Sequence, residues 1–426
     1  MLNAAGEREL AYVVLIDGID PIPGYDRVEY ATVGGWRVIV QKGQFQVGDP
    51  AIYFEIDSKV PSDRECFAFL EKRNYKVKTL KMCRVISQGL LMHAEDFGWS
   101  IINQKDLANL SILDTKGIVT NLSVLDAKGI VDNTGKCHYP SDESRFLTKE
   151  LGVTYADAED NQRKAAPVDK YKKMAQRHPA IFKKPFVRWL MKHKWGRKLM
   201  FFFFGKKKDK KNGWPAWVSK TDEERVQNMP WILQDDGVWV ATEKIDGSST
   251  TFTMKRGKRG KNEFYVCSRN VCFDSVDKPC YYDTNIYWEM AQKYDMYNVL
   301  TKLLETYPNS EWVTIQGETY GAGVQKRDYS MKGHDFKAFN LILSECGRLS
   351  TIDMQNILEN EMNIPCVPIM SVIHINKFVD VDDILNFAAG NSMVDGLPRE
   401  GIVFRSWDGT KSFKAVSNSF LLKYHC

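Results

Sequence analysis

Short strand-like runs separated by glycine and proline fill residues 10–92, and they restrict what this part of the 426-residue chain can fold into. Apolar and polar residues alternate in several of these runs, as they do in a strand with one buried face. The runs are AYVVLI, RVEYATV, WRVIVQKG, DPAIYFEI and KVKTLKMCRVISQGLLM. Such a series predicts a small closed or nearly closed barrel of the OB type. These barrels either bind nucleic acid or dock other domains, so the pattern alone does not decide the function.

From residue 219 onward, strand-like runs alternate with amphipathic helical stretches. The strand-like runs are VWVATEKI, TTFTMKR, EFYVCSR, WVTIQGETY, HDFKAFNLIL, EGIVFRS and KSFKAV. The helical stretches are IYWEMAQKYDMYNVLTKLLETY, TIDMQNILENEM and DVDDILNFAAG. This order predicts an α+β domain with its own core, and we expect the chemistry there.

The region between these two parts has a different composition. LSILDTKGIVT is followed by LSVLDAKGIVD, a duplication over residues 110–132 that is too short for a solenoid and indicates a local surface expansion. Residues 163–211 hold eighteen Lys and Arg against two Asp, although the whole chain has a net charge of only +5. Such a segment either attracts a polyanion or is a solvated tether. Residues 179–200 space aromatic and basic side chains as in a helix, which could lie on nucleic acid or a membrane, or pack on a neighbouring domain.

Several classes of protein are disfavoured by what the sequence lacks. The nine cysteines form no CxxC pair, which favours reduced thiols over a disulfide framework or a zinc site. The first residues do not have the basic and apolar segments of a signal peptide. No stretch approaches the ~20 apolar residues of a membrane span. We therefore expect a cytoplasmic protein without a membrane span.

Lys244, Asp246 and Gly247 stand at the end of the strand-like run VWVAT. Alternation along a strand places Lys244 and Asp246 on one face, and glycine allows the chain to turn sharply close to a ligand. A lysine and a carboxylate would then share one site. The pattern K-x-D-G recurs by chance, however, so the motif carries little weight alone.

Five further motifs follow in order, each on or beside an expected strand. They are Ser268-Arg269-Asn270, Gly317-Glu318, Phe336-Lys337-Ala338-Phe339, Glu400-Gly401-Ile402-Val403 and Ser412-Phe413-Lys414. In this order they resemble the motifs of the covalent nucleotidyltransferase superfamily, which comprises polynucleotide ligases and mRNA capping enzymes. The resemblance covers about residues 219–424. The leader KTDEERVQN (residues 220–228) and the first 92 residues resemble the ATP-dependent RNA ligases of the nick-sealing branch with an N-terminal OB module.

The resemblance implies three parts of the chain and a reaction in three steps. The parts are an OB-like β-barrel module (1–98), a basic, partly helical insertion or linker (99–218), and an adenylyltransferase domain of antiparallel sheets flanked by helices (219–426). ATP first transfers AMP to Lys244, the AMP then passes to a 5′-phosphate, and a 3′-hydroxyl finally expels it. ATP and Mg²⁺ or Mn²⁺ are the implied cofactors. RNA, as a nicked duplex or an RNA/DNA hybrid, is the implied partner of a monomeric enzyme.

The same resemblance assigns roles to individual residues. The implied catalytic residues are Lys244, Lys414, Asp246 and Glu400, and the last two offer hard oxygen ligands to the metal. The implied nucleotide contacts are Glu243, Lys244, Arg269, Glu318, Phe336 or Phe339, Glu400 and Lys414. Arg225 and Asn228 are the implied nucleic-acid contacts. Because an amine attacks phosphorus only when neutral, we expect burial and nearby positive charge to lower the pKa of Lys244 from its ordinary ~10.4.

The sequence leaves three alternatives open. A capping guanylyltransferase or a DNA ligase would form the same lysine adduct, but each normally has an OB domain after the lysine domain. A catalytically silent nucleic-acid-binding protein of this fold is the third. One position departs from the family pattern, since Val416 stands where many relatives carry a second lysine; Lys411 or Lys423 could replace it.

Overall fold

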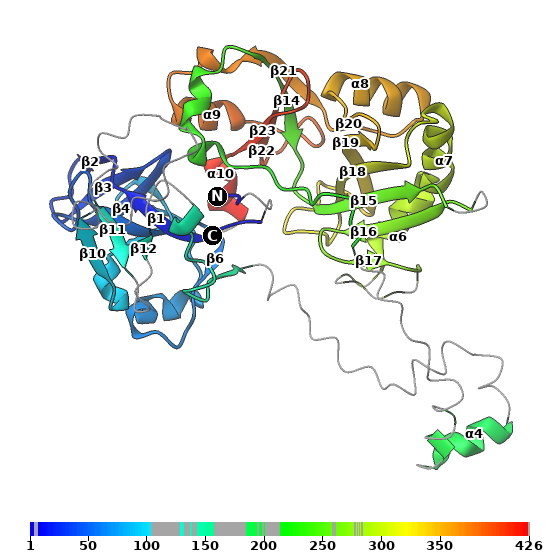
Figure 1. Ribbon diagram of the computed structural model, residues 1–426, viewed down its shortest axis with the longest axis horizontal. Coiled ribbons are helices and arrows are strands. Elements are labelled where there is room, and N and C mark those ends of the chain that lie inside the picture. The colour runs from blue at the N-terminus through cyan, green and yellow to red at the C-terminus, as the bar shows by residue number, and fades with distance from the viewer. Residues whose placement is uncertain are drawn as a thin grey trace.

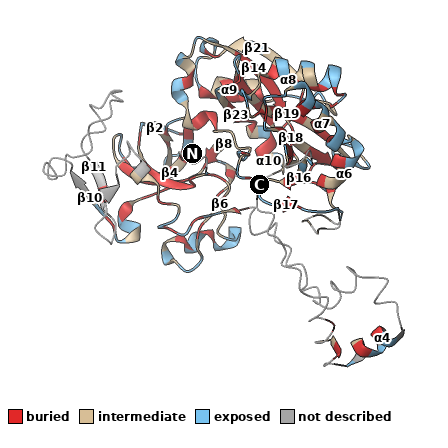
Figure 2. Cartoon of the chain, turned by 45° about the vertical axis from the view of Figure 1, so that its right-hand side comes forward, coloured by how far each residue is buried: buried red, intermediate tan, exposed pale blue. Residues whose placement is uncertain are grey.

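The computed structural model describes most of both predicted domains. It describes residues 1–3, 7–103, 128–131, 137–138, 143–156, 185–193, 196–197, 200, 214–257, 261–276, 278, 280, 282 and 284–424. Most of the duplication and of the basic segment lies outside these residues. Within the basic segment, helix α4 (Pro185–Lys192) is described and lies apart from both domains in Figures 1 and 2.

The expected strands of the OB module all form. They are β1 (Ala11–Leu15), β2 (Gly18–Pro21), β3 (Val28–Val33), β4 (Trp36–Gln41), β5 (Pro50–Phe54), β7 (Thr79–Met82), β8 (Val85–Gln88) and β9 (Leu90–Met92). The strands pair antiparallel in the orders β1-β5-β9, β2-β3-β4 and β7-β8 (Figure 1, blue). In β4, Trp36, Val38 and Val40 are buried while Arg37 faces solvent, which is the alternation that predicted the strand.

The OB unit extends beyond residue 98, where the sequence placed its boundary. Short strands β10 (Ser100–Asn103), β11 (Lys128–Val131) and β12 (Cys137–His138) form a sheet, and β13 (Thr154–Tyr155) pairs with β6 (Ser58–Lys59). Three short 3₁₀ helices accompany them: η1 (Glu65–Arg73), η2 (Ala94–Phe97) and η4 (Glu143–Arg145). Apolar residues of this segment join the core of β1 and β5: Trp99, Ile130, Leu147, Leu151 and Val153. The described part of residues 99–156 therefore packs with the barrel.

Two antiparallel sheets build the second domain. Strands β21 (Ile369–His374), β14 (Val238–Lys244), β22 (Gly401–Ser406) and β23 (Ser412–Val416) form the four-stranded sheet in that order. The six-stranded sheet has the order β17 (Cys272–Phe273), β16 (Glu263–Ser268), β15 (Ser248–Lys255), β18 (Trp312–Gly321), β19 (His334–Leu343) and β20 (Gly347–Arg348). Figure 1 shows the two sheets side by side.

Helices cover the sheets of the second domain. They are α6 (Ile286–Lys293), α7 (Met296–Thr306), α8 (Thr351–Gln355), α9 (Val381–Ala388) and α10 (Asn418–Tyr424), with shorter turns η5 (Val226–Asn228), η6 (Pro230–Gln234), η8 (Asn356–Glu361) and η9 (Ile375–Lys377). The long stretch expected over 286–307 is two helices, because Asp295 has a left-handed backbone with φ of 45°. Residues from α6, α7 and the six-stranded sheet share one core, drawn red in Figure 2. These expectations of an OB module and an α+β domain are confirmed.

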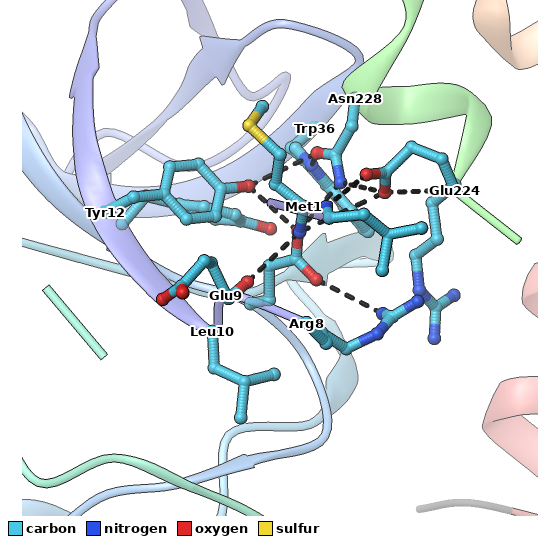
Figure 3. Close-up of polar contacts among 12 residues, drawn as sticks. Met1, Arg8, Glu9, Leu10, Tyr12, Trp36, Glu224 and Asn228 are labelled. Atoms are coloured by element: carbon cyan, nitrogen blue, oxygen red, sulfur yellow. Dashed lines mark hydrogen bonds and ion pairs between the residues drawn. The ribbon is translucent and has the colours of Figure 1, made fainter. Parts of the chain in front are cut away.

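A buried carboxylate, Glu55, joins the two domains. It follows β5 and accepts hydrogen bonds from Tyr12 Oη (3.0 Å), Asn228 Nδ2 (2.8 Å) and Arg8 Nη1 (3.3 Å), and it also pairs with the ammonium of Met1. Figure 3 shows this network, in which Asn228 reaches the barrel from the leader segment. Burial raises the pKa of Glu55, but the Met1 ammonium and Arg8 outweigh it and lower the pKa to about 2.

Replacing Glu55 by glutamine should destabilise the fold by about 3–5 kcal/mol at neutral pH, because the buried cations lose their partner. A carboxyl with a depressed pKa stabilises the fold above its ordinary pKa of 4.5 and loses that effect as the pH falls toward 2. Urea unfolding of the wild type and Glu55→Gln at several pH values checks this. A difference that stays constant down to the lowest pH contradicts it.

Candidate active site

Both sheets of the second domain carry predicted site residues. In the four-stranded sheet, Lys244 ends β14 opposite Gly401, so Glu400 lies beside it, and Lys414 stands on the next strand opposite Val403. In the six-stranded sheet, β18 carries Glu318, and Arg269 lies in the turn between β16 and β17. Residues 245–247 connect β14 of one sheet with β15 of the other.

Gly247 is required where this connection enters the second sheet. A Cβ atom at this position would lie 2.4 Å from the carbonyl oxygen of Thr319, which is closer than any real contact. The backbone N–H of the preceding Asp246 donates to Tyr329 Oη at 2.7 Å. The close approach of Gly247 to Thr319 and the hydrogen bond of Asp246 fix the short link that brings Lys244 toward the six-stranded sheet.

Lys244 is surrounded by carboxylates. Its Nζ lies 2.7 Å from Glu400 Oε2, and the two side chains are only 26% and 12% exposed. Burial lowers the pKa of Lys244, but Glu400, Glu318 and Asp246 together outweigh burial, so the pKa lies above its ordinary value. The expected lowering of the Lys244 pKa is therefore not found, because negative rather than positive groups are closest to the amine.

The pKa of Glu318 is affected by the same group of neighbouring carboxylates. Burial and repulsion from Glu400 and Asp246 raise its pKa to about 8, although Lys244 acts in the opposite direction. Among the described residues, no three His, Cys, Asp or Glu side chains are arranged to hold a metal ion by themselves. Mg²⁺ usually binds through one or two carboxylates together with phosphate oxygens. The donor set of Asp246 and Glu400 fits such a cation, whose charge would relieve the repulsion.

Asp222 is a site residue that the sequence analysis did not single out. It lies in the leader and binds Lys414 Nζ at 2.7 Å, Arg269 Nη2 at 2.8 Å and Arg8 Nε at 3.3 Å. Despite its burial, these three cations hold the pKa of Asp222 well below its ordinary range. Burial, and next the charge of Arg8, lower the pKa of Lys414 to about 8. The leader's run of three acidic residues gives no signal of which one is buried.

Of the two phenylalanines expected to stack on adenine, the structure disfavours Phe336. It is fully buried and packs edge-on against Phe252 at 5.3 Å between ring centroids. Strand alternation places Phe336 and Ala338 in the helical core, while Phe339 lies on the opposite face and packs with Ile245 beside the nucleophile segment. The pairing of β18 with β19 has a β-bulge between Gln316 and Gly317, close to Phe339 along the strand pair. Phe339 remains the candidate.

Glu243 lies on the other side of β14 from Lys244. Its Oε2 accepts the N–H of Met393 at 2.8 Å, and its Oε1 is buried with no hydrogen-bond partner among the described residues. A buried acceptor without a donor carries an energetic cost.

Arg225 and Asn228 connect the domains instead of facing open solvent. Arg225 is 5% exposed, donates to Asp57 Oδ2 at 2.9 Å and lies over the Trp36 ring. Asn228 accepts from Trp36 Nε1 at 2.6 Å and donates to Glu224 Oε1 at 2.8 Å (Figure 3). Arg225 and Asn228 were expected to contact nucleic acid, whereas their contacts in this structure join the two domains.

The possible replacements for a second lysine also lie elsewhere. Val416 packs in the core of the OB module. Lys411 is exposed and pairs with Asp235 at 3.1 Å, and Lys423 lies over the ring of Tyr424. Lys414 therefore stands in the site without either of them as a partner.

Comparison with known proteins agrees with this architecture. Residues 10–94 match a family model described as an OB-fold domain, and residues 237–425 match one described as RNA ligase. The chain thus joins an OB-fold domain to a nucleotidyltransferase-like domain of two antiparallel sheets. The RNA ligase model covers nearly the whole of this second domain. A search of the curated proteins gives no match.

Solved structures of Naegleria gruberi RNA ligase are similar over the whole chain. The form with PPi is 25% identical, with a TM-score of 0.65 and coverage of 98% of this chain and 99% of that one. A mutant with AMP and Mn gives the same values. A mutant with ATP and Mn has 24% identity, a TM-score of 0.66 and coverage of 98% and 100%, which supports the fold. No described helix is long and apolar enough to cross a membrane.

Proposed function

We propose that this chain is an ATP-dependent RNA ligase that joins a 3′-hydroxyl to a 5′-phosphate at breaks in RNA-containing strands. The observation that carries the proposal is the partly buried pair of Lys244 and Glu400, in a domain that matches the RNA ligase family model. ATP, AMP, PPi and Mn in the similar Naegleria structures support ATP and a divalent cation as cofactors.

In the first step, Lys244 Nζ attacks the α-phosphorus of ATP. The ammonium first loses a proton to give the neutral amine; a phosphorus–nitrogen bond then forms, the bond to the bridging oxygen breaks, pyrophosphate leaves and a second proton is lost. Asp246 and Glu400 would hold a divalent cation, whose positive charge would offset these carboxylates and the phosphate oxygens. Lys414 and Arg269 add charge from the protein side, which stabilises the transition state of phosphoryl transfer.

Three side chains are suited to hold the nucleoside. Glu318, with its raised pKa, offers a carboxyl group to the ribose hydroxyls. Phe339 offers an aromatic ring on the same side of the domain as Ile245. The unpaired Oε1 of Glu243 is an acceptor, which fits the exocyclic amine of adenine and not the oxygen of guanine. This preference supports ATP over GTP and hence a ligase over a capping guanylyltransferase.

In the later steps, AMP passes to the 5′-phosphate and the 3′-hydroxyl then displaces it. Both steps require the two RNA ends to be held in register. We assign this task to the surface that the OB module and the second domain form together around the site.

Incubation with α-labelled ATP or GTP and Mg²⁺ or Mn²⁺, followed by denaturing electrophoresis, tests the proposal. A covalent adduct from ATP, and sealing of a nick in RNA, are expected. An adduct from GTP alone supports a capping enzyme, sealing restricted to DNA nicks supports a DNA ligase, and no adduct from either nucleotide supports a silent binder.

Replacing Glu243 by glutamine should invert the hydrogen-bonding group that faces the base. The side-chain oxygen is expected to keep the bond to the Met393 N–H, which leaves an NH₂ donor in place of Oε1. The ratio of adduct formed from ATP to adduct formed from GTP should fall by about tenfold to a hundredfold. Glu305→Gln, at an exposed position of α7, is the matched control. An unchanged ratio would remove Glu243 from the base contacts.

A further inference from the structure

We propose that Arg8, from the OB module, positions Asp222 beside Lys414 and Arg269 for lysine adenylylation. This inference rests on the proposed function and assigns Arg8 and Asp222 as positioning residues. It differs from a role of the module in holding RNA alone, because Arg8 acts before any RNA is bound.

The geometry places Arg8 against both oxygens of Asp222. Its Nε lies 3.3 Å from Oδ2 and its Nη2 lies 3.3 Å from Oδ1, while its Nη1 lies 3.3 Å from Glu55 Oε2 of the barrel. Arg8 and Asp222 are only 7% and 10% exposed. A planar guanidinium in this arrangement fixes the plane of the carboxylate, which a single-point contact cannot do.

Asp222 uses the same two oxygens to contact the cations of the site. Oδ1 binds Lys414 Nζ at 2.7 Å, and Oδ2 binds Arg269 Nη2 at 2.8 Å. These two cations come from different sheets of the second domain. One carboxylate from the leader therefore sets the positions of both, and the orientation of that carboxylate depends on the barrel.

Charge gives Arg8 a second effect on the site. Three cations share one negative charge at Asp222, so Lys414 and Arg269 retain positive charge for a phosphate. Without Arg8, the carboxylate would pair more strongly with Lys414 and Arg269 and compete with the incoming nucleotide. The contact thus favours nucleotide over the internal ion pair.

Other contacts already hold the domains together, so docking alone does not account for Arg8. Arg37 of β4 pairs with Asp382 of α9 at 2.8 Å on the exposed side of the junction. The N–H of Gly35 donates to Gln227 O at 2.7 Å, and Trp36 donates to Asn228. None of these pairs contacts Lys414 or Arg269. Arg37 therefore offers a matched control: an ion pair of the same junction that leads away from the site.

The test compares Arg8→Met with Arg37→Met in single-turnover formation of the lysine adduct from ATP and Mn²⁺. Arg8→Met should slow the adduct by about tenfold to a hundredfold, the loss expected for a charge-assisted pair. Arg37→Met should change it by less than about threefold, as for an exposed pair. Sealing of pre-adenylylated RNA, which bypasses this step, should fall less in Arg8→Met. Equal effects of the two variants on the adduct overturn the proposal.

A double-variant cycle separates action through Asp222 from a general loosening. If Arg8 acts through Asp222, Arg8→Met combined with Asp222→Asn should be no slower than Asp222→Asn alone. Arg37→Met combined with Asp222→Asn should instead show multiplied effects. Multiplied effects for Arg8 as well would contradict the proposal.

The pH profile supplies a signature that a structural role would not produce. Lys414 is faced by Asp222, Arg8, Arg225 and Lys244, with Arg269 on the far side of Asp222. Loss of Arg8 removes a positive neighbour and should move the alkaline fall in adduct formation to higher pH, whereas Asp222→Asn should move it to lower pH. Absence of these opposite shifts counts against the proposal.

A separate measurement distinguishes loss of folding from loss of function in these variants. Thermal unfolding of each variant identifies loss of structure. If Arg8→Met unfolds, Arg8→Lys replaces it: this variant keeps the charge but loses the two-point contact, so an intermediate slowing without a shift of the pH profile is expected, and wild-type speed contradicts the proposal. A wild-type chain that forms no adduct refutes the proposed function, whereas a normal adduct with unaffected Arg8 variants refutes only this inference.

Discussion

Lys244→Ala is expected to abolish the labelled adduct, with a fall in lysine adenylylation of about 10⁴-fold or more, as for removal of a catalytic nucleophile. In the proposed reaction AMP is attached to the partly buried amine beside Glu400, and alanine supplies no replacement. Adduct formation from labelled ATP, resolved by denaturing electrophoresis, measures the loss. Binding of ATP itself should weaken far less, because Glu318, Phe339 and Lys414 remain.

The same variant should still seal RNA whose 5′ end is already adenylylated. That step joins the 3′-hydroxyl to an activated phosphate and needs no lysine adduct. Lys255→Ala, at the end of β15 where the lysine pairs with Glu311, serves as the control. An undiminished adduct in Lys244→Ala would disprove the proposed chemistry.

Lys414→Met should slow adduct formation by about a hundredfold to a thousandfold, the usual cost of removing one preorganised group that stabilises transition-state charge. Methionine keeps much of the side-chain volume and removes the charge next to Asp222. Because the pKa of Lys414 is lowered to about 8, wild-type activity should decline as the pH rises above that value, where the amine loses its proton. Single-turnover rates across pH should show this decline in the wild type and not in Lys414→Met.

Lys411→Met provides the comparison for this result. Lys411 lies on the same strand-to-strand hairpin but is exposed and pairs with Asp235, so its loss should change the rate by less than about threefold. Equal losses in the two variants would mean that position 414 acts only through general surface charge.

Strand alternation and turn residues were sufficient to predict most of the fold. The run around Trp36 has buried and exposed residues in the alternating order that the structure shows, whereas the strand that ends at Lys244 is buried on both faces. The break between α6 and α7 was not predicted, since an aspartate with left-handed backbone leaves no mark on the apolar pattern. The barrel's extension past residue 98 was also missed, because its apolar residues are spread over short segments far apart in the chain.

The site was only partly predictable, since some of its properties arise from contacts between distant segments. Motif order predicted that Lys244, Glu400 and Lys414 share one site, and the pairing of β14, β22 and β23 brings these three positions to one sheet. The raised pKa of Lys244 depends on three carboxylates from separate strands, and no local pattern reveals their sum. The role of Asp222 likewise depends on Arg8, more than two hundred residues earlier in the chain.

The leader between the barrel and the lysine domain has a consequence for engineering. Gly35 approaches Gln227 so closely that a Cβ atom would lie 2.7 Å from its Cα, and Arg225 is enclosed between Asp57 and Trp36. A chimaera that exchanges either domain for that of a distant homologue would have to exchange this nine-residue leader together with the barrel surface on which it packs. Modular design of such enzymes should therefore treat the leader as part of both modules.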